Sequence, residues 1–206
     1  MSMRKFLRGE EPPVLAKHGK EWGREWEPRC KGGGFYWHEH GNRKVNHILL
    51  DGLKKQTQNH CSFCDAYPVA PPGQDNIEHF RPKSQYPLEA FAWDNLYYCC
   101  NFCQGQKREK FDEKLLRPDA PGYRFDDYFR WDYTSGDLHP NPGAPLENRE
   151  RARITIEMYG LNTAHPQSRC DERDKVAAMS NSAIQQDKHP YRNFLFQTES
   201  PNPPNV

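Results

Sequence analysis

The clearest hydrophobic pattern along the chain lies in residues 42–58. Apolar side chains recur there at intervals of three and four, with Lys and Gln between them, so they fall on one face of a helix: Val45, Ile48, Leu49 and Leu53. The pattern predicts an amphipathic helix that leads directly into the first pair of cysteines.

Two further helices and a hairpin are predicted in the second half of the chain. One helix covers residues 146–159 and stops at Gly160, a residue suited to the left-handed C-terminal position. A less regular pattern predicts another over residues 165–186. Residues 117–145 are aromatic before the sequence TSGD and proline-rich after it, which is typical of two strands joined by a turn.

No sustained period is found in residues 1–41, which are rich in Gly, Pro, Trp and charge. We expect an irregular N-terminal arm that contacts a partner and packs on the protein through Trp22, Trp26, Phe35 and Trp37. The predicted domain organisation continues with a core over residues 42–116, a hairpin and C-terminal helices packed on it over residues 117–196, and a disordered tail over residues 197–206.

Composition limits the fold and function classes. A chain of 206 residues is long enough for one domain with extensions. Charged residues make up 28% and hydrophobic residues 35%, with a mean hydropathy of −1.07, so a metal or a partner is expected to supply part of the stability. The net charge of +1 is not that of a typical nucleic-acid-binding domain, so any such function requires a defined site.

The chain has no run of about 18 apolar residues, and its first residues lack the apolar stretch of a signal peptide. We therefore expect a cytoplasmic protein without a membrane segment. In that compartment the seven cysteines should stay reduced, so their spacing matters more than their number.

Two C-x2-C pairs predict a structural zinc site. They are CSFC at 61–64 and CNFC at 100–103, and together they offer four thiolates: Cys61, Cys64, Cys100 and Cys103. Zinc held by four thiolates has no open position for chemistry, but it could contribute on the order of 10 kcal/mol to folding. A redox pair or simple core packing is the alternative. Cys99 is expected to be a packing residue, and Cys30 and Cys170 free thiols.

The loop between the two pairs carries further reactive residues. It holds the dipeptide EH at 78–79, followed by Pro82 and Asn95, and Lys107 lies four positions beyond the last cysteine. The order C-x2-C, EH-x2-P, N, C-x2-C, x3-K resembles that of zinc-stapled HNH endonucleases over residues 61–110. The resemblance implies an α+β fold with a ββα-metal HNH core, in which two strands and a helix grip one divalent ion, surrounded by helices and the irregular arm.

A wider set of segments resembles the HNH subunit of Septu-type anti-phage defence systems, also found beside some retrons. These segments are IEHFRPKSQYP, the WDNL step, the hairpin around Gly136, and TIEMYGLN at 155–162. The resemblance implies a DNA substrate, an ABC-type ATPase as partner, and a higher-order complex.

His79 is predicted to be the general base, because a neutral imidazole with an ordinary pKa of about 6.5 accepts a proton from water at cellular pH. The resemblance implies that Glu78 binds a catalytic Mg²⁺ or Mn²⁺ and that Asn95 hydrogen-bonds the loop backbone so that His79 is oriented. Since neighbouring residues of a regular strand point to opposite faces, we expect a twist or bulge at these two positions.

The family position directly after the last cysteine is usually His or Asn, and here it is Gln104. A glutamine carbonyl can ligate a hard cation, so Gln104 is predicted to share the divalent ion with Glu78. Lys107, Arg81 and Lys83 are candidates for contacts with the substrate phosphate, although a solvated helix face is an equal alternative for the segment around Lys107.

Two other functions are compatible with these residues. One is a non-catalytic zinc-ribbon adaptor that binds nucleic acid or protein, which the departure at Gln104 and the near-neutral charge favour. The other is a purely structural regulator of the ATPase. Because few excess cations are available, DNA affinity should be modest and targeting should depend on a partner, held through exposed aromatic residues of segment 22–37 and the third helix.

Overall fold

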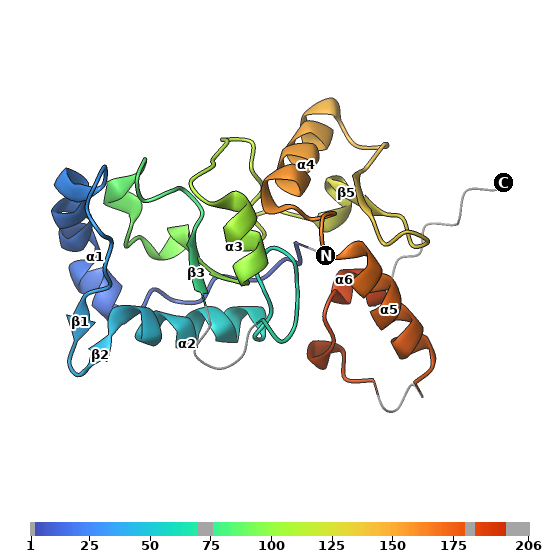
Figure 1. The fold of residues 1–206 in the computed structure, drawn as a ribbon, viewed down its shortest axis with the longest axis horizontal. Helices are drawn as coiled ribbons and strands as arrows, with labels where there is room; N and C mark the ends of the chain where they lie inside the picture. Colours follow the sequence, from blue (N-terminus) through green and yellow to red (C-terminus); the bar gives the residue numbers. More distant parts are fainter. Residues whose placement is uncertain (1–2, 70–75, 180–183, 197–206) are drawn as a thin grey trace.

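The structure, a computed structural model, describes residues 3–69, 76–179 and 184–196 (Figure 1). One end of the molecule holds α1 (Pro13–Trp26), β1 (Glu39–His40) and β2 (Arg43–Lys44). The middle holds α2 (Val45–Thr57), β3 (Asn76–His79), β4 (Leu96–Cys99) and α3 (Asn101–Lys107). The other end holds β5 (Phe129–Trp131), β6 (Leu138–Pro140), α4 (Leu146–Tyr159), α5 (Pro166–Ala177) and α6 (Arg192–Leu195). Short 3-10 helices are η1 (Glu27–Arg29), η2 (Pro87–Glu89), η3 (Trp93–Asn95), η4 (Phe125–Asp127) and η6 (Gln186–Lys188).

Strands of the described residues pair into three antiparallel two-stranded sheets, β1–β2, β3–β4 and β5–β6. The β5–β6 pair is the hairpin predicted within residues 117–145. Gly136 at its turn has a φ of +77°, a conformation that glycine adopts without steric cost. The mixture of helices and short sheets confirms the α+β class.

The two strongest helix predictions are confirmed. α2 begins at Val45, later than the predicted residue 42 because residues 43–44 form β2, and it buries the predicted face, with Leu49 and Leu53 fully inaccessible. Gln58, directly after its last residue, adopts the left-handed conformation. α4 spans the predicted residues, and Gly160 follows with a φ of +61°, as expected for a glycine that ends a helix.

The third helix is shorter than predicted. α5 begins at Pro166, a favourable first position because proline has no backbone N–H to leave unpaired, and it ends at Ala177. Residues 186–188 form η6 instead, so the helix does not continue to the end of the predicted segment 165–186. The predicted disordered tail, residues 197–206, lies outside the described residues.

The prediction of an irregular arm over residues 1–41 is wrong for residues 13–26, which form α1. The glycines that suggested irregularity have a packing reason instead. A Cβ atom at Gly19 would lie 2.9 Å from the carbonyl oxygen of Phe91, and one at Gly23 would lie 2.7 Å from that of Leu88. These glycines let α1 approach the segment around η2 closely, and their cost in helix propensity is offset by that contact.

The aromatic residues expected on an exposed partner surface are largely buried. Trp22 and Trp26 are 8% and 5% accessible, and Phe35 and Trp37 pack against the same hydrophobic cluster. Only Tyr36, at 49%, is a substantially exposed aromatic residue of segment 22–37. The segment therefore packs on the protein as predicted, but it does not present an aromatic surface to a partner.

Two hydrophobic clusters meet at the β3–β4 sheet. Because side chains alternate across a strand, β4 contributes Tyr97 and Cys99 to one cluster and Leu96 and Tyr98 to the other. The first cluster surrounds the cysteines and α4, and the second joins α1 to α2. The central sheet therefore connects both ends of the molecule.

A group of charged residues fastens the N-terminal segment to this sheet. The Asp119 carboxylate, 3% exposed, accepts hydrogen bonds from Arg8 Nε at 2.7 Å, Arg117 Nη2 at 3.2 Å and the Tyr97 hydroxyl at 2.6 Å. Arg8 also donates to the Leu96 carbonyl at 2.9 Å. Burial opposes ionisation of Asp119, but Arg8, Arg117 and Tyr97 outweigh it and lower the pKa of the carboxyl below its ordinary value.

Asp119→Asn is expected to lower the free energy of unfolding at pH 7 by about 2 kcal/mol, because it leaves two guanidinium groups without their charged acceptor. The native pKa is depressed, so this stabilisation is present above the unfolded-state pKa and is lost as pH falls below about 4. Denaturant unfolding at both pH values measures the difference, with the exposed Asp187→Asn as control. Equal stabilities of Asp119→Asn and the unmodified protein at pH 7 would contradict it.

Within the described parts of the chain, none of the helices combines the length and apolar character needed to cross a membrane.

Candidate metal centre and the adjoining cleft

The four predicted cysteines come together in one buried cluster. The sulfur atoms of Cys61, Cys64, Cys100 and Cys103 all lie within 4.8 Å of one another. Each C-x2-C pair supplies two of them, and the Cys64 and Cys100 sulfurs are 3.5 Å apart. Backbone N–H groups point at the sulfurs: that of Cys103 donates to Cys100 Sγ and that of Cys100 donates to Cys61 Sγ, both at 3.4 Å.

This donor set fits a structural zinc ion. Four sulfurs bound to one tetrahedral ion at about 2.3 Å would be separated by roughly 3.8 Å, which the observed spacing accommodates. Contacts with Cys103, Cys61 and Cys64 lower the pKa of the Cys100 thiol, whereas burial raises the pKa of the Cys64 and Cys103 thiols well above the ordinary value. A bound cation would therefore be needed to hold all four as thiolates. With four protein ligands, such an ion would have no open position and would serve the fold.

The three other cysteines behave as predicted. Cys99 is fully buried in the hydrophobic cluster, outside the group of four, and its sulfur lies 3.4 Å from the Cys100 carbonyl oxygen. Burial raises the pKa of the Cys99 thiol well above its ordinary value, as expected for a packing residue. Cys30 and Cys170 are free thiols.

The strands and helix that carry the site lie between and beside the two cysteine pairs. β3 pairs with β4 in antiparallel register from Asn76 opposite Cys99 to His79 opposite Leu96, with no residue inserted. The predicted bulge at Glu78 and His79 is therefore wrong. The two side chains leave opposite faces of a regular strand, and each meets a different element.

The His79 ring lies at the base of a cleft and is held in one orientation. Its Nε2 is 2.9 Å from the Ala90 carbonyl oxygen. A carbonyl only accepts, so Nε2 carries the hydrogen and Nδ1 keeps a lone pair. Nδ1 has no partner among the described residues and is not one of their fully buried unpaired atoms, so it faces the cleft. Burial, assisted by Lys83, lowers the pKa of His79 to about 3, so the ring is neutral at pH 7 but is a weaker base than the ordinary pKa of about 6.5 predicted.

Aromatic side chains from the N-terminal segment form a wall of this cleft. Trp37 stacks on the His79 ring with centroids 5.8 Å apart and planes at 15°, and Phe35 meets it edge-on at 5.4 Å. The sequence predicts these residues to be packing groups but does not predict their contact with His79. Their spacing of two positions indicates one face of an extended segment, but no local pattern identifies the surface it covers.

Glu78 is engaged in a buried ion pair that was not predicted. Lys107 Nζ, fully inaccessible, donates to Glu78 Oε1 and to the His79 carbonyl oxygen, both at 2.8 Å. Burial raises the pKa of Glu78, although Lys107 acts in the opposite direction. Both interpretations of Lys107, as a phosphate ligand and as part of a solvated helix face, are therefore wrong, because its ammonium group is enclosed by the protein.

Gln104 lies beside this pair, as its predicted role requires. Its Nε2 donates to the Ile77 carbonyl oxygen at 3.1 Å, and the proximity of its side chain acts to lower the pKa of Glu78. Both residues line the cleft, so the Gln104 carbonyl and the second Glu78 oxygen are the groups that could hold a divalent ion there. Two ligands are fewer than a site of protein groups alone needs, and water and a substrate phosphate would have to complete it.

Asn95 has the contacts predicted for it. Its Oδ1 accepts from the Arg81 backbone N–H at 2.7 Å, and its Nδ2 donates to the carbonyls of Arg81 and Glu89 at 3.0 Å each. The side chain, 3% exposed, thus ties together the two segments of loop on either side of the His79 contact with Ala90.

The predicted phosphate-binding cations divide into two groups. Arg81 pairs with Glu89 at 3.0 Å and Glu113 at 3.5 Å and does not line the cleft, so it is not available there. Lys83 does line the cleft, with Glu109 at 3.7 Å. Arg108 is a cleft cation that the sequence analysis did not select, because a charged residue at a helix end is most often solvated.

The cleft has a volume of about 470 Å³ and is open to solvent. Its charged and polar lining comes from β3, α3 and the loop after β3, and its aromatic lining from the N-terminal segment. The residues concerned are Phe35, Trp37, Ile77, Glu78, His79, Pro82, Lys83, Asn101, Gln104, Gly105, Arg108 and Glu109.

Comparison with known proteins adds no family to this picture. The sequence matches no protein-family model, and no curated protein matches it. Any proposal about the activity of the chain therefore rests on the chemistry of the four-cysteine cluster and of the His79 cleft.

Proposed function

We propose that the protein is a metal-dependent endonuclease of the HNH type that hydrolyses phosphodiester bonds of DNA. The observation that carries this proposal is the His79 ring, neutral and fixed by the Ala90 carbonyl, with its free nitrogen facing a cleft that also holds two carboxylates and two cationic side chains. The strands β3 and β4 lie between the two cysteine knuckles and α3 begins within the second one, an order that supports the resemblance of residues 61–110 to that class.

The reaction requires a water molecule activated in line with the leaving oxygen and neutralisation of charge on the phosphoryl group. His79 Nδ1 would accept the proton of that water, while Nε2–H remains bound to the Ala90 carbonyl and prevents the ring from rotating. Lys83 and Arg108 would lie beside the phosphate and reduce its negative charge.

Glu78 and Gln104 are the residues that would hold Mg²⁺ or Mn²⁺. When bound, such an ion polarises the phosphate and stabilises the leaving oxygen. Lys107 already balances the charge of Glu78 at a distance of 2.8 Å. Glu78 and Gln104 alone would therefore bind a divalent cation weakly. We therefore expect the ion to bind together with the substrate rather than before it.

The direct test is cleavage of supercoiled plasmid DNA by the zinc-loaded protein. Nicking is expected with added Mg²⁺ or Mn²⁺ and not without them, because the cleft offers too few ligands to retain the ion through purification. Omitting the divalent ion is preferable to adding a chelator, which could also remove structural zinc. Equal cleavage with and without added metal would contradict a metal-dependent mechanism.

A zinc-ribbon adaptor without catalysis is the second candidate. The Glu78–Lys107 ion pair favours it, because a carboxylate already neutralised by a lysine has less attraction for a metal ion. An adaptor would bind duplex DNA or a protein without cutting DNA under any divalent metal. Because the net charge is only +1, both candidates leave room for a targeting partner, and the resemblance of the wider segments makes an ABC-type ATPase the proposed one.

A further inference from the structure

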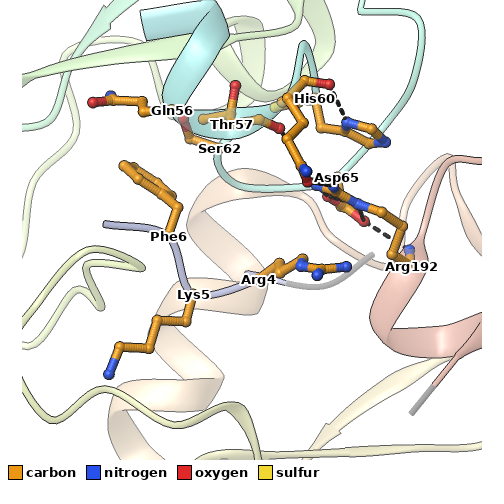
Figure 2. Close-up of a pocket in the computed structure, with 11 residues that line it drawn as sticks. Arg4, Lys5, Phe6, Gln56, Thr57, His60, Ser62, Asp65 and Arg192 are labelled. Carbon is orange, nitrogen blue, oxygen red and sulfur yellow. Dashed lines mark hydrogen bonds and ion pairs between the residues drawn. The ribbon is translucent and has the colours of Figure 1, made fainter. Parts of the chain in front are cut away.

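Close to its C-terminal end the described chain returns to the first cysteine pair, CSFC at 61–64. The returning segment, which we term the clasp, comprises residues 189–195 and includes α6. It meets the pair through His60 and Asp65, which directly flank the cysteines and are each 1% exposed (Figure 2). Although 127 positions separate Asp65 from Arg192, the clasp thus reaches the loop that carries half of the candidate zinc ligands.

Asp65 holds the clasp through both its side chain and its backbone. Its carboxylate accepts hydrogen bonds from the Arg192 backbone N–H at 2.7 Å, from Nε at 3.1 Å and from Nη2 at 2.5 Å (Figure 2). Its carbonyl oxygen accepts from the Tyr191 backbone N–H at 2.9 Å. Arg192 is only 4% exposed, and its Nη1 donates to Gln58 Oε1 just after α2. Because a buried charge without its partner is strongly unfavourable, Asp65 and Arg192 each require the other in place.

His60 makes the second link, on the other side of the cysteine pair. Its Nε2 lies 3.0 Å from the His189 carbonyl oxygen, and its ring stacks on that of Tyr67 with centroids 4.7 Å apart. The ring of His189 faces α5, since its Nδ1 lies 2.9 Å from Glu172 Oε1. The clasp is therefore held between the first cysteine pair and α5.

The backbone at this junction adopts conformations that local sequence does not favour. Four residues have φ between +53° and +62°: Gln58, Asn59, Asp65 and Tyr191. They are four of the five non-glycine residues with positive φ in the part of the chain that the structure describes. Asn and Asp tolerate this region, but a glutamine or a tyrosine persists in it only where surrounding contacts hold the backbone. The loop around the first cysteine pair therefore depends on other interactions for its shape.

We propose that the loop around the first cysteine pair keeps the shape that the clasp recognises only while the cysteines hold zinc, so that docking of residues 189–195 depends on the metal. The four sulfur atoms lie within 4.8 Å of one another, and thiolates at that spacing repel when no cation lies between them. Because His60 and Asp65 adjoin the cysteines directly, a loop that opens would carry both contacts away from the clasp. By linkage, the docked clasp in turn raises the affinity for zinc.

α5 provides an internal reference, because its buried anchor does not involve the cysteine pair. Arg169, fully inaccessible, donates to the Leu161 carbonyl at 2.5 Å and to the Gly136 carbonyl. These carbonyls lie just after α4 and in the β5–β6 turn. Removal of the metal should therefore release the clasp and leave α5 in place.

Hydrogen exchange of the full-length protein, with zinc and after zinc removal by a chelator under reducing conditions, tests this dependence without any measurement of DNA cleavage. The informative amides are those of Tyr191 and Arg192, which both donate to Asp65. Their exchange should rise about tenfold or more on zinc removal, within the usual range of coupling between two sites, while that of α5 changes little. Unchanged exchange at both amides would overturn the proposal. An equal rise throughout α5 would also overturn it, because the metal would then support the whole C-terminal region.

The reciprocal effect is measured by competition for zinc with a chromophoric chelator. Arg192→Gln removes the side-chain partner of Asp65 and should weaken zinc binding about tenfold. Arg8→Gln is the matched control, since it breaks another arginine–aspartate pair, with Asp119, that does not involve the clasp. It should bind zinc like the unmodified protein. Unchanged zinc affinity of Arg192→Gln, or equal weakening in both variants, would contradict the proposed coupling.

A double variant keeps the test valid if Arg192→Gln alone folds poorly. Asp65→Asn combined with Arg192→Gln replaces the charged pair by two amides and leaves no unpaired charge buried. If the pair transmits the coupling, the double variant should bind zinc no more weakly than Asp65→Asn alone. Losses that add would show that the two residues act separately on the metal site, and the clasp would then not be the element that senses zinc.

Discussion

Replacing His79 with alanine is expected to reduce Mg²⁺- or Mn²⁺-dependent DNA cleavage by about 10²- to 10⁴-fold, the range usual for loss of a general base. The reason is specific to this ring. Its Nε2 is committed to the Ala90 carbonyl, and its Nδ1 is the basic atom that faces the cleft. The rate of plasmid nicking at saturating metal measures the effect.

Controls must separate catalysis from folding, because the His79 ring also packs against Trp37 and Phe35. His79→Gln keeps more of the buried volume and should be inactive as well. His139→Ala removes an exposed histidine on β6 and should cleave DNA like the unmodified protein. Zinc content and circular dichroism should match across all four proteins. Full cleavage by a well-folded His79→Ala would remove the nuclease proposal.

Cys100→Ser is expected to abolish stoichiometric zinc binding and cooperative thermal unfolding of the central region. A serine hydroxyl is not deprotonated at neutral pH and is a poor substitute for a thiolate ligand. Structural zinc contributes on the order of 10 kcal/mol, as much as the whole stability of a typical domain. Cys100 stands at the junction of β4 and α3, so its loss should release both elements. Metal analysis and calorimetry measure the outcome.

The neighbouring cysteine provides a matched control. Cys99→Ala changes the adjacent cysteine, the last residue of β4, whose sulfur lies outside the group of four. It should retain one zinc ion per chain and lose only the small stability of a packing contact. Identical zinc content in Cys99→Ala and Cys100→Ser would show that the four-sulfur assignment is mistaken.

The sequence predicted those parts of the fold in which local spacing and tertiary need agree. The Val45, Leu49 and Leu53 pattern produced α2, Gly160 ended α4, and Gly136 marked the β5–β6 turn. The C-x2-C spacing also predicted the cysteine cluster, because two residues between cysteines bring both sulfurs to one point whatever surrounds them.

Local patterns failed where long-range contacts decide the conformation. Gly19 and Gly23 argue against a helix in isolation, yet α1 forms because those positions must admit the carbonyls of Phe91 and Leu88. Phe35 and Trp37 gave no indication that they would enclose His79, since residues more than 40 positions apart in sequence share no local pattern.

The site shows the same division. Asn95 met its predicted loop contacts because its role depends on a motif that spans a short segment of chain. The predictions for Lys107 failed, because whether a lysine near a helix end reaches solvent or turns inward depends on the strand packed beneath it. The β3–β4 register is likewise regular rather than bulged, since Glu78 and His79 contact different elements on opposite faces of the strand.

By itself, then, the sequence determined the residue types and the spacings: four thiolates in two knuckles, a Glu-His pair between them, and the helices with a clear apolar face. Only the tertiary structure decided which of these groups are available for chemistry. It turned Lys107 inward against Glu78, fixed His79 on Ala90 and paired Asp65 with Arg192. The physical reason is that availability depends on burial and on the nearest charged or polar atoms, and these come from segments distant in the sequence.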